Sequence, residues 1–223
     1  MRELASRVLM AAAIAAQFAL CLFVGAAVPG ALGQTPAHGE SSPDHKGGSQ
    51  AKSAEDALSV SAERGGPTKG LPLPRFAVVW EGKLSRSGNS KEAGAWEWLR
   101  GRGVNGVVNF RERNNVDYDR FGFKQVLWIP LANGALPTEE EAEHYLRFIQ
   151  EPANQPVHVY CAEGKDRTGM MIALARYAVE GWTMDAAIAE ARLFRRGEDL
   201  AQPRIDWLRA WEARHKPGSH RRR

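Results

Sequence analysis

A cysteine and an arginine, separated by five residues, are the side chains with the clearest chemistry in this sequence. Cys161 ends an apolar run, and Arg167 opens a helix-like segment and is followed by a Thr-Gly pair. A cysteine attacks phosphorus as the thiolate, which a helix N-terminus stabilises. The same helix end binds phosphate through its free N–H groups, and an arginine can hold two phosphate oxygens at once. The pair therefore predicts phosphoryl transfer, with Cys161 as nucleophile and Arg167 as phosphate clamp.

The residues around this pair are candidates for binding the phosphate. Gly164 permits a tight turn and a close approach of the backbone to a ligand. The Thr168 hydroxyl, one residue past the clamp, can hydrogen-bond the cysteine sulfur. Lys165 is either a contact to a multiply charged substrate or a solvated loop lysine. The N–H groups expected to converge on the anion are those of Ala162, Glu163, Gly164, Lys165, Asp166 and Arg167.

The elements that position the loop can be predicted from composition. Residues 155–160 are rich in β-branched and aromatic side chains and predict a strand, whereas residues 167–179 predict a buried helix. The alternation of such segments predicts an α/β fold, with a largely parallel sheet of about four to five strands flanked by helices. Further strands are predicted at 76–80, 83–86, 106–110 and 123–129, and further helices at 90–100, 138–149, 183–194 and 205–214, the first three capped by Ser90, Thr138 and Thr183.

The loop resembles a known signature. Residues 161–169, Cys-x-x-Gly-Lys-Asp-Arg-Thr-Gly, are similar to the signature loop of the protein tyrosine and dual-specificity phosphatase superfamily, in the version of bacterial tyrosine phosphatases and phosphoinositide-active members. Residues 83–90 and 99–111 resemble the opening of small bacterial members. The resemblance implies the cysteine phosphatase fold, a phosphocysteine intermediate on Cys161 and phosphoryl binding by Arg167. It implies no metal and no other cofactor, because the arginine and the loop amides supply the positive charge.

One departure from the family pattern lies beside the cysteine. Tyr160 precedes it where the family usually has a histidine that supports the loop. His158 lies one pleat further away on the same strand face, so it is not expected to replace that histidine. Arg86, in the upstream Arg-Ser-Gly segment, is expected to hold a turn rather than to contact substrate.

The second departure concerns the general acid. The family places an aspartate on a mobile loop ahead of the cysteine, but residues 129–137 contain neither Asp nor Glu. Asp166 is therefore the candidate acid, with a helix cap as its alternative role, and Glu163 is the second choice. Asn133 is a candidate substrate contact from the position of the missing acid.

These features predict a cysteine-dependent hydrolase of phosphate monoesters that acts in two displacement steps. The substrate class stays open between phosphorylated proteins, on tyrosine or on serine and threonine, phosphoinositide lipids and inositol phosphates. The two departures keep a second interpretation open, a catalytically weak phosphate-binding module of the same fold. A rhodanese-like sulfur transferase also places a cysteine in an anion-binding loop, but the Arg-Thr-Gly ending of this loop argues against it.

Length and charge narrow the possible ligand classes and the domain organisation. The 223 residues carry 30 Lys and Arg against 26 Asp and Glu, a net charge of +4. This mixture gives no nucleic-acid signal, whereas a modest positive excess suits an anionic substrate. The length fits one domain with extensions: residues 71–215 as the phosphatase domain, 34–70 as a disordered linker rich in Gly, Ser and Pro, and 216–223 as a basic, disordered tail.

The N-terminus predicts export. Two arginines precede an apolar stretch at 8–28, and residues 31–33 are of the kind that a signal peptidase requires. Residues 1–33 are therefore predicted to be a signal peptide, with an uncleaved membrane anchor through 8–28 as the alternative. We expect a periplasmic or secreted protein, or one anchored to the cytoplasmic membrane. Loss of Cys21 with this segment leaves Cys161 unpaired in an oxidising compartment, which suggests that the thiol is kept for use.

Overall fold

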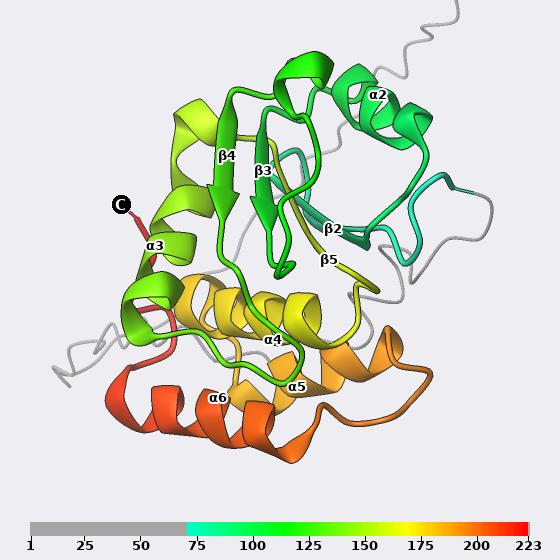
Figure 1. The fold of residues 1–223 in the computed structure, drawn as a ribbon. Helices are drawn as coiled ribbons and strands as arrows, with labels where there is room; N and C mark the ends of the chain where they lie inside the picture. Colours follow the sequence, from blue (N-terminus) through cyan, green and yellow to red (C-terminus); the bar gives the residue numbers. More distant parts are fainter. Residues whose placement is uncertain (1–70, 223) are drawn as a thin grey trace, which may run out of the picture. The chain divides into compact units, whose positions relative to one another are not determined.

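A computed structural model describes residues 71–222 of the chain (Figure 1). Residues 1–33, predicted to be a signal peptide or anchor, and 34–70, predicted to be a linker, lie outside the described residues. Within residues 71–222, no helix is both long and apolar enough to cross a bilayer. The described part holds a five-stranded sheet with the order β1-β2-β5-β3-β4, in which β1 and β2 are antiparallel and the other pairs are parallel. The strands are β1 (Ala77–Trp80), β2 (Leu84–Gly88), β3 (Gly106–Asn109), β4 (Gln125–Trp128) and β5 (Val157–Cys161).

Helices cover both faces of this sheet. Val108 and Val159 point to one face and pack with α3, α4, α5 and α6, whereas Val107 and Tyr160 point to the other and pack with α2. Figure 1 shows α4, α5 and α6 stacked together on one side. The predicted α/β fold with a largely parallel sheet is therefore confirmed. The helices are α2 (Ala93–Gly101), α3 (Glu139–Gln150), α4 (Asp166–Ala175, continued by a π-helical turn at Arg176–Glu180), α5 (Met184–Leu193) and α6 (Gln202–Arg214).

The starts of three helices test the predicted caps. Thr138 and Glu141 form the capping box of α3, because the Thr138 hydroxyl accepts from Glu141 N at 3.1 Å and the Glu141 carboxylate accepts from Thr138 N at 2.8 Å. Thr183 caps α5, as predicted. The prediction that Ser90 caps α2 is wrong, since that helix begins later. Glu92 is its N-cap residue, and the Ser90 hydroxyl instead accepts from Glu92 N in the turn before the helix.

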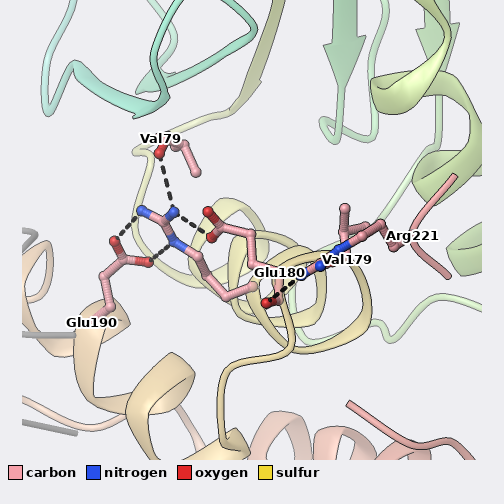
Figure 2. Close-up of polar contacts among 6 residues, drawn as sticks. Val79, Val179, Glu180, Glu190 and Arg221 are labelled. Atoms are coloured by element: carbon pink, nitrogen blue, oxygen red, sulfur yellow. Dashed lines mark hydrogen bonds and ion pairs between the residues drawn. The ribbon is translucent and has the colours of Figure 1, made fainter. Parts of the chain in front are cut away.

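A buried arginine joins α4 to two neighbouring elements. Arg176 is 2% exposed, and its Nε and Nη2 donate to the two carboxylate oxygens of Glu190 on α5 at 2.9 and 2.7 Å. Its Nη1 donates to Val79 O of β1 at 3.0 Å and to Glu180 at 2.5 Å, as the dashed lines in Figure 2 show. Removing one partner of such a buried pair typically costs about 3–5 kcal/mol. The network therefore fixes the helix that begins at the cysteine loop.

The C-terminal tail corrects one prediction. Residues 216–223 were expected to be disordered, but the described residues 216–222 pack against the end of α4 and against α3. Gly218 N donates to Tyr177 O at 2.8 Å, and Arg221 donates to the carbonyls of Val179 and Glu180. Figure 2 shows Arg221 beside these two residues. The carbonyls at a helix end lack partners within the helix, and the tail supplies donors for them. A charge count over the tail does not reveal these contacts.

Candidate active site

The cysteine loop joins the central strand of the sheet to α4. Cys161 is the last residue of β5, which lies between β2 and β3, and α4 begins at Asp166. The predicted strand-to-helix turn is therefore present, with the helix beginning one residue earlier than expected. Cys161 is buried, and Arg167 lies in the first turn of α4. The two residues with the predicted chemistry are thus brought to the carboxyl end of the parallel strands, where α/β proteins bind ligands.

Three consecutive carbonyl groups of the loop accept hydrogen bonds from donors outside it. The pairs are Ala162 O with Asn89 N (3.1 Å), Glu163 O with Arg75 Nη1 (2.9 Å) and Gly164 O with Arg86 Nη2. In a trans peptide the C=O and N–H groups point in opposite directions, so each N–H group of residues 163–165 points away from the donor that binds the carbonyl of its peptide. The Gly164 N–H donates to Cys161 Sγ at 3.2 Å. The loop therefore presents the Gly164 N–H to the sulfur, as an anion-binding loop does.

Two glycines let the loop lie directly against β2. Gly164 has φ +72°, and a Cβ built there would lie 2.4 Å from Gly88 N and 2.6 Å from Ser87 C. A Cβ at Gly88 would lie 2.7 Å from both the carbonyl carbon and the carbonyl oxygen of Glu163. Neither position has room for a side chain. The predicted need for glycine at 164 thus has a structural cause, which is the contact between two backbones as well as the left-handed conformation.

Arg86 supports the loop from the middle of β2. Its side chain is 1% exposed, its Nη2 donates to Gly164 O, and its guanidinium lies 3.7 Å above the ring centre of Phe194. Burial lowers the pKa of Arg86 to about 10, and Coulomb attraction to Glu190 and Cys161 opposes that decrease. The guanidinium stays charged at neutral pH. Arg86 therefore places a positive charge near Cys161, in addition to the turn-holding role expected from the sequence.

The Arg167 guanidinium reaches the ends of two neighbouring strands. Its Nη1 donates to Leu131 O at 2.8 Å and to Phe110 O at 3.4 Å. Phe110 follows β3, and Leu131 lies in the segment after β4 that holds no carboxylate. These contacts use one nitrogen of the guanidinium and leave other N–H groups for a phosphate. Asn133 is exposed two residues beyond Leu131, on the same segment that Arg167 contacts.

Both predicted acids are held in ion pairs. Asp166 Oδ1 accepts from Arg195, which follows α5 and also donates to Asp199 O at 2.8 Å. Glu163 Oε2 pairs with Lys165 Nζ at 2.7 Å. The Lys165 contact holds the pKa of Glu163 below its usual range, so Glu163 is a poor proton donor at neutral pH. Lys165 is half-buried in this pair rather than solvated.

Thr168 lies at the base of the loop. Its side chain is fully buried, and among residues 71–222 its hydroxyl has no hydrogen-bond partner. The predicted contact between Thr168 and the cysteine sulfur is thus not among the hydrogen bonds of the structure. A buried hydroxyl without a partner costs free energy, and Thr168 directly follows Arg167 in the first turn of α4.

Tyr160, which stands where the family usually has a histidine, packs away from the sulfur. Its ring lies in the cluster below α2, and its hydroxyl lies 2.6 Å from that of Tyr118. Burial raises the pKa of both tyrosines above the usual range. Both are therefore neutral phenols at physiological pH, and Tyr160 supplies packing and a buried hydrogen bond rather than charge.

His158 supports the loop indirectly. Its Nε2 lies 2.8 Å from Ser87 Oγ and its Nδ1 lies 2.9 Å from Ser85 Oγ. Since Ser87 Oγ donates to Gly88 O at 2.7 Å, it accepts from Nε2–H, and Ser85 then donates to Nδ1. Burial lowers the pKa of His158 to about 3, so the ring is neutral and suited to one donor and one acceptor. His158 does not reach the sulfur, but it fixes the strand residues that touch the loop.

The buried His158 gives stability a specific pH dependence. Its pKa of about 3 in the folded protein lies below the ordinary 6.5, so only the unfolded chain binds a proton as pH falls, and stability decreases below pH 6.5. Between pH 7 and 5 the unfolding free energy of the wild type should fall by about 2 kcal/mol more than that of His158→Gln. This follows from a slope of about 1.4 kcal/mol per pH unit below pH 6.5. Urea unfolding of both proteins measures this. Replacement of the exposed His144 by Gln is the control, and an equal pH dependence in all three proteins would contradict the assignment.

A cavity beside the loop carries mostly positive charge. Its volume is about 520 Å³, and one wall is Asn89, whose N–H donates to Ala162 O of the loop. Arg111, on the same wall, also contacts the Asn89 side chain at 3.5 Å. The charged lining residues are Lys91, Arg111, Arg120 and Asp117. The excess of cations favours an anionic ligand beside the cysteine loop.

Sequence reasoning missed several residues that shape the site. Arg75 and Arg195 lie 88 and 29 positions away from the loop residues that they bind, and no local pattern marks such contacts. For Gly88 and for the two serines of β2, a weak sequence pattern could have indicated a role in the site. Ser85 and Ser87 share one strand face with His158 on the paired strand, so a buried polar cluster is the arrangement that their alternation favours.

Comparisons with known proteins agree with this geometry. The sequence matches the family described as "DSP-PTPase phosphatase fused to NAD+ Kinase" over residues 79–208, more than half of the chain. The core catalytic domain of the PP-IP phosphatase SIW14 from S. cerevisiae, solved with citrate, has a TM-score of 0.53 at 20% identity and covers 62% of this chain and 85% of that one. The active form of Tk-PTP has a TM-score of 0.51 at 23% identity, covering 60% and 95%. These two structures show the fold.

One curated protein adds a local likeness. The mRNA-capping enzyme of Caenorhabditis elegans is 36% identical over 61 residues, which make up 26% of this chain and 10% of that protein. The chain therefore spans a small part of the capping enzyme, and the likeness carries none of that enzyme's overall activity. The family match, the five-stranded fold and the strand-to-helix cysteine loop agree with one another. The chain belongs to the DSP-PTPase family, the phosphoric monoester hydrolases of the protein tyrosine and dual-specificity phosphatase type.

Proposed function

We propose that this chain hydrolyses phosphate monoesters through a phosphocysteine intermediate on Cys161. The observation that carries the proposal is the orientation of the loop. Three loop carbonyls are bound by outside donors, and the Gly164 N–H faces the sulfur. A phosphoryl group seated over Cys161 then meets converging N–H groups in a site that needs little reorganisation.

The reaction takes two displacement steps. In the first, the Cys161 thiolate attacks phosphorus, the S–P bond forms, and the P–O bond to the leaving alcohol breaks while that oxygen takes a proton. In the second, water attacks the phosphocysteine, inorganic phosphate leaves, and the thiolate returns. The free N–H groups of Arg167 and the loop amides bind the three non-bridging oxygens in both steps. The buried Thr168 hydroxyl donates to the sulfur as the S–P bond breaks, which gives its free hydroxyl a partner.

Asp166 is the proposed proton donor of the first step and base of the second. It is the first residue of α4, and Arg195 engages one of its carboxylate oxygens, Oδ1, which leaves Oδ2 for a leaving oxygen. Glu163 is less suited, because its pair with Lys165 favours the ionised carboxylate. Because Arg195 donates to Oδ1 of Asp166, the proton of the first step has to be delivered from the other carboxylate oxygen, Oδ2.

Asp166→Asn should therefore show a defect that depends on the leaving group. We expect kcat to fall about 10²-fold or more for phenyl phosphate, whose leaving oxygen needs a proton, and far less for p-nitrophenyl phosphate, whose phenolate is stable. The change should also remove one limb of the pH–rate profile. Steady-state rates with both esters, measured with a metal chelator present, test this and the phosphatase assignment together.

Arg195→Gln is the matched control, since it breaks the same ion pair but keeps the carboxylate. If Asp166 only anchors the helix to Arg195, the two variants will share one defect, equal for both esters, and the proposed acid role is wrong. If the folded wild-type protein turns over neither ester, the chain is the alternative, a phosphate-binding module of the same fold. The wild-type rates therefore test the phosphatase assignment, and the comparison of the two variants separately tests the acid role of Asp166.

The charge around the loop supports a phosphorylated substrate with additional negative charge. Lys91, Arg111 and Arg120 line the cavity that begins at Asn89, and Lys165 lies within the loop. A phosphotyrosine in an acidic segment, a phosphoinositide headgroup and an inositol phosphate each fit this charge. The structural likeness to a PP-IP phosphatase is consistent with the third class. Asn133, exposed on the segment that Arg167 contacts, is a proposed further substrate contact.

A further inference from the structure

Two histidines and a glutamate meet at the end of the molecule opposite to the cysteine. Glu143 lies on α3, His215 is the C-cap residue of α6, and His220 lies in the C-terminal tail. One ligand atom from each residue lies within 4.8 Å of the other two, and all three side chains are half-buried. The Tyr177 hydroxyl donates to His215 O at 2.6 Å, which places this cluster beside the C-terminal end of α4, whereas Cys161 precedes its N-terminal end.

The hydrogen bonds of the two imidazoles leave one nitrogen of each available. His215 Nδ1 lies 3.1 Å from Trp211 O, to which it can only donate, so Nε2 carries the lone pair. His220 Nδ1 lies 3.0 Å from Ser219 Oγ, which leaves its Nε2 available. Metal-binding histidines usually donate their other N–H to a carbonyl or another oxygen in this way, which fixes the ring orientation. The cluster therefore has oriented ligand nitrogens as well as proximity.

We propose that Glu143, His215 and His220 form a binding site for a divalent transition-metal ion of the Zn²⁺ class. Two imidazoles and one carboxylate are a set of three protein ligands that zinc accepts, with water in the fourth position. At bond lengths of about 2.0–2.1 Å, tetrahedral ligand atoms lie about 3.4 Å apart, so the separations in the cluster, which are all within 4.8 Å, have to shorten by at most about 1.4 Å. Glu139, one helical turn before Glu143 and 3.6 Å from His215 Nε2, can replace the water.

The contacts that a metal ion must replace are weak. Glu143 is bound to Arg147 at 3.4 Å, and Glu139 to Arg214 at 3.1 Å, all with side chains about half-exposed. Exposed pairs of this kind contribute about 1 kcal/mol or less. His220 is already positioned by its main chain, because its N–H donates to Ala178 O at 2.9 Å and its carbonyl accepts from Gln150 at 2.9 Å. The main-chain contacts thus hold this ligand in place before any metal binds.

The bound ion would fasten the tail to α3. The three ligands come from α3, the end of α6 and the tail, which only the folded chain brings together. Binding to the folded form alone raises stability in proportion to the logarithm of ligand concentration over Kd. The site is structural rather than catalytic, and it is independent of the proposed phosphatase mechanism at Cys161.

Zinc titration of the full-length chain tests the proposal. Both Cys21 and Cys161 are replaced by Ser in every protein, because thiolates are competing zinc ligands. Isothermal titration calorimetry should show one zinc ion per chain at the site, and the melting temperature should rise with zinc concentration. His220→Ala and Glu143→Gln should each weaken this binding at least about tenfold and abolish the rise in melting temperature.

His144→Ala is the matched control, since His144 is exposed on α3 next to Glu143. It should bind zinc as the parent does. His38 and His45 remain in all the proteins and contribute the same background. The proposal is overturned if the parent binds no zinc in a defined ratio, or if His220→Ala and Glu143→Gln bind it as tightly as the parent and His144→Ala. Circular dichroism of each variant without zinc separates loss of the site from loss of the fold.

Discussion

Cys161→Ser should abolish phosphatase turnover while leaving the fold and phosphate binding intact. A serine hydroxyl in the same place does not ionise at neutral pH, so it is a far weaker nucleophile than a thiolate. We expect kcat for p-nitrophenyl phosphate to fall about 10³-fold or more. The substitution exchanges one atom in a residue that is 2% exposed, so the melting temperature should change little.

Phosphate binding distinguishes a chemical defect from a structural one. The loop N–H groups and Arg167 do not depend on the sulfur, so inorganic phosphate should still bind to Cys161→Ser in a calorimetric titration. Cys21→Ser is the control for the chemistry of thiols in general, and it should keep the wild-type rate. Retention of more than about a tenth of the activity by Cys161→Ser would be incompatible with a cysteine nucleophile.

Gly164→Ala should have the largest effect of the substitutions within the loop. A Cβ at this position would lie 2.4 Å from Gly88 N and 2.6 Å from Ser87 C, and both are backbone atoms of a paired strand. The positive φ of +72° adds a second cost, since an L-residue in that conformation loses about 1–2 kcal/mol. Together with overpacking of about 1–3 kcal/mol, unfolding free energy should fall by about 3 kcal/mol, and activity should be lost as the loop leaves β2.

Gly103→Ala separates these two contributions. Gly103 has φ +77° but no atom within 4 Å of an added Cβ, so this variant has only the conformational cost. Urea unfolding should show that Gly103→Ala lowers the unfolding free energy by about 1–2 kcal/mol. The rate of phosphate hydrolysis should be unchanged. If both alanine variants lose the same stability and Gly164→Ala stays active, the contact between the loop and β2 is not what positions the loop.

The sequence predicted the centre of the site well because its determinants are local. The strand before Cys161, the helix after it and the arginine spacing all lie within residues 155–179, and β5 and α4 have the predicted order. The fold class followed from the alternation of strand and helix patterns. These local patterns did not predict the order of the strands in the sheet. Local patterns also predicted the capping box of Thr138 and the cap of Thr183 correctly.

What the sequence did not show depends on contacts between distant segments. The pairing of Asp166 with Arg195 joins α4 to the chain after α5, and it changes how the proposed acid must work. The hydrogen bonds of His158 depend on the register that places it opposite Ser85 on β2. The disorder of the tail was predicted from composition alone. Composition gives no information about the helix-end carbonyls that the tail binds.

The central claim is that a covalent phosphocysteine forms on Cys161, and trapping that intermediate tests it most directly. Full-length protein is mixed with p-nitrophenyl phosphate, quenched with acid within one turnover and digested, and the peptides are examined by mass spectrometry. We predict one phosphoryl group on the peptide that contains Cys161, greater occupancy in Asp166→Asn if water activation is slowed, and none in Cys161→Ser. Hydrolysis at the wild-type rate without any phosphoryl group on that peptide, or with the group on another residue, would contradict the account.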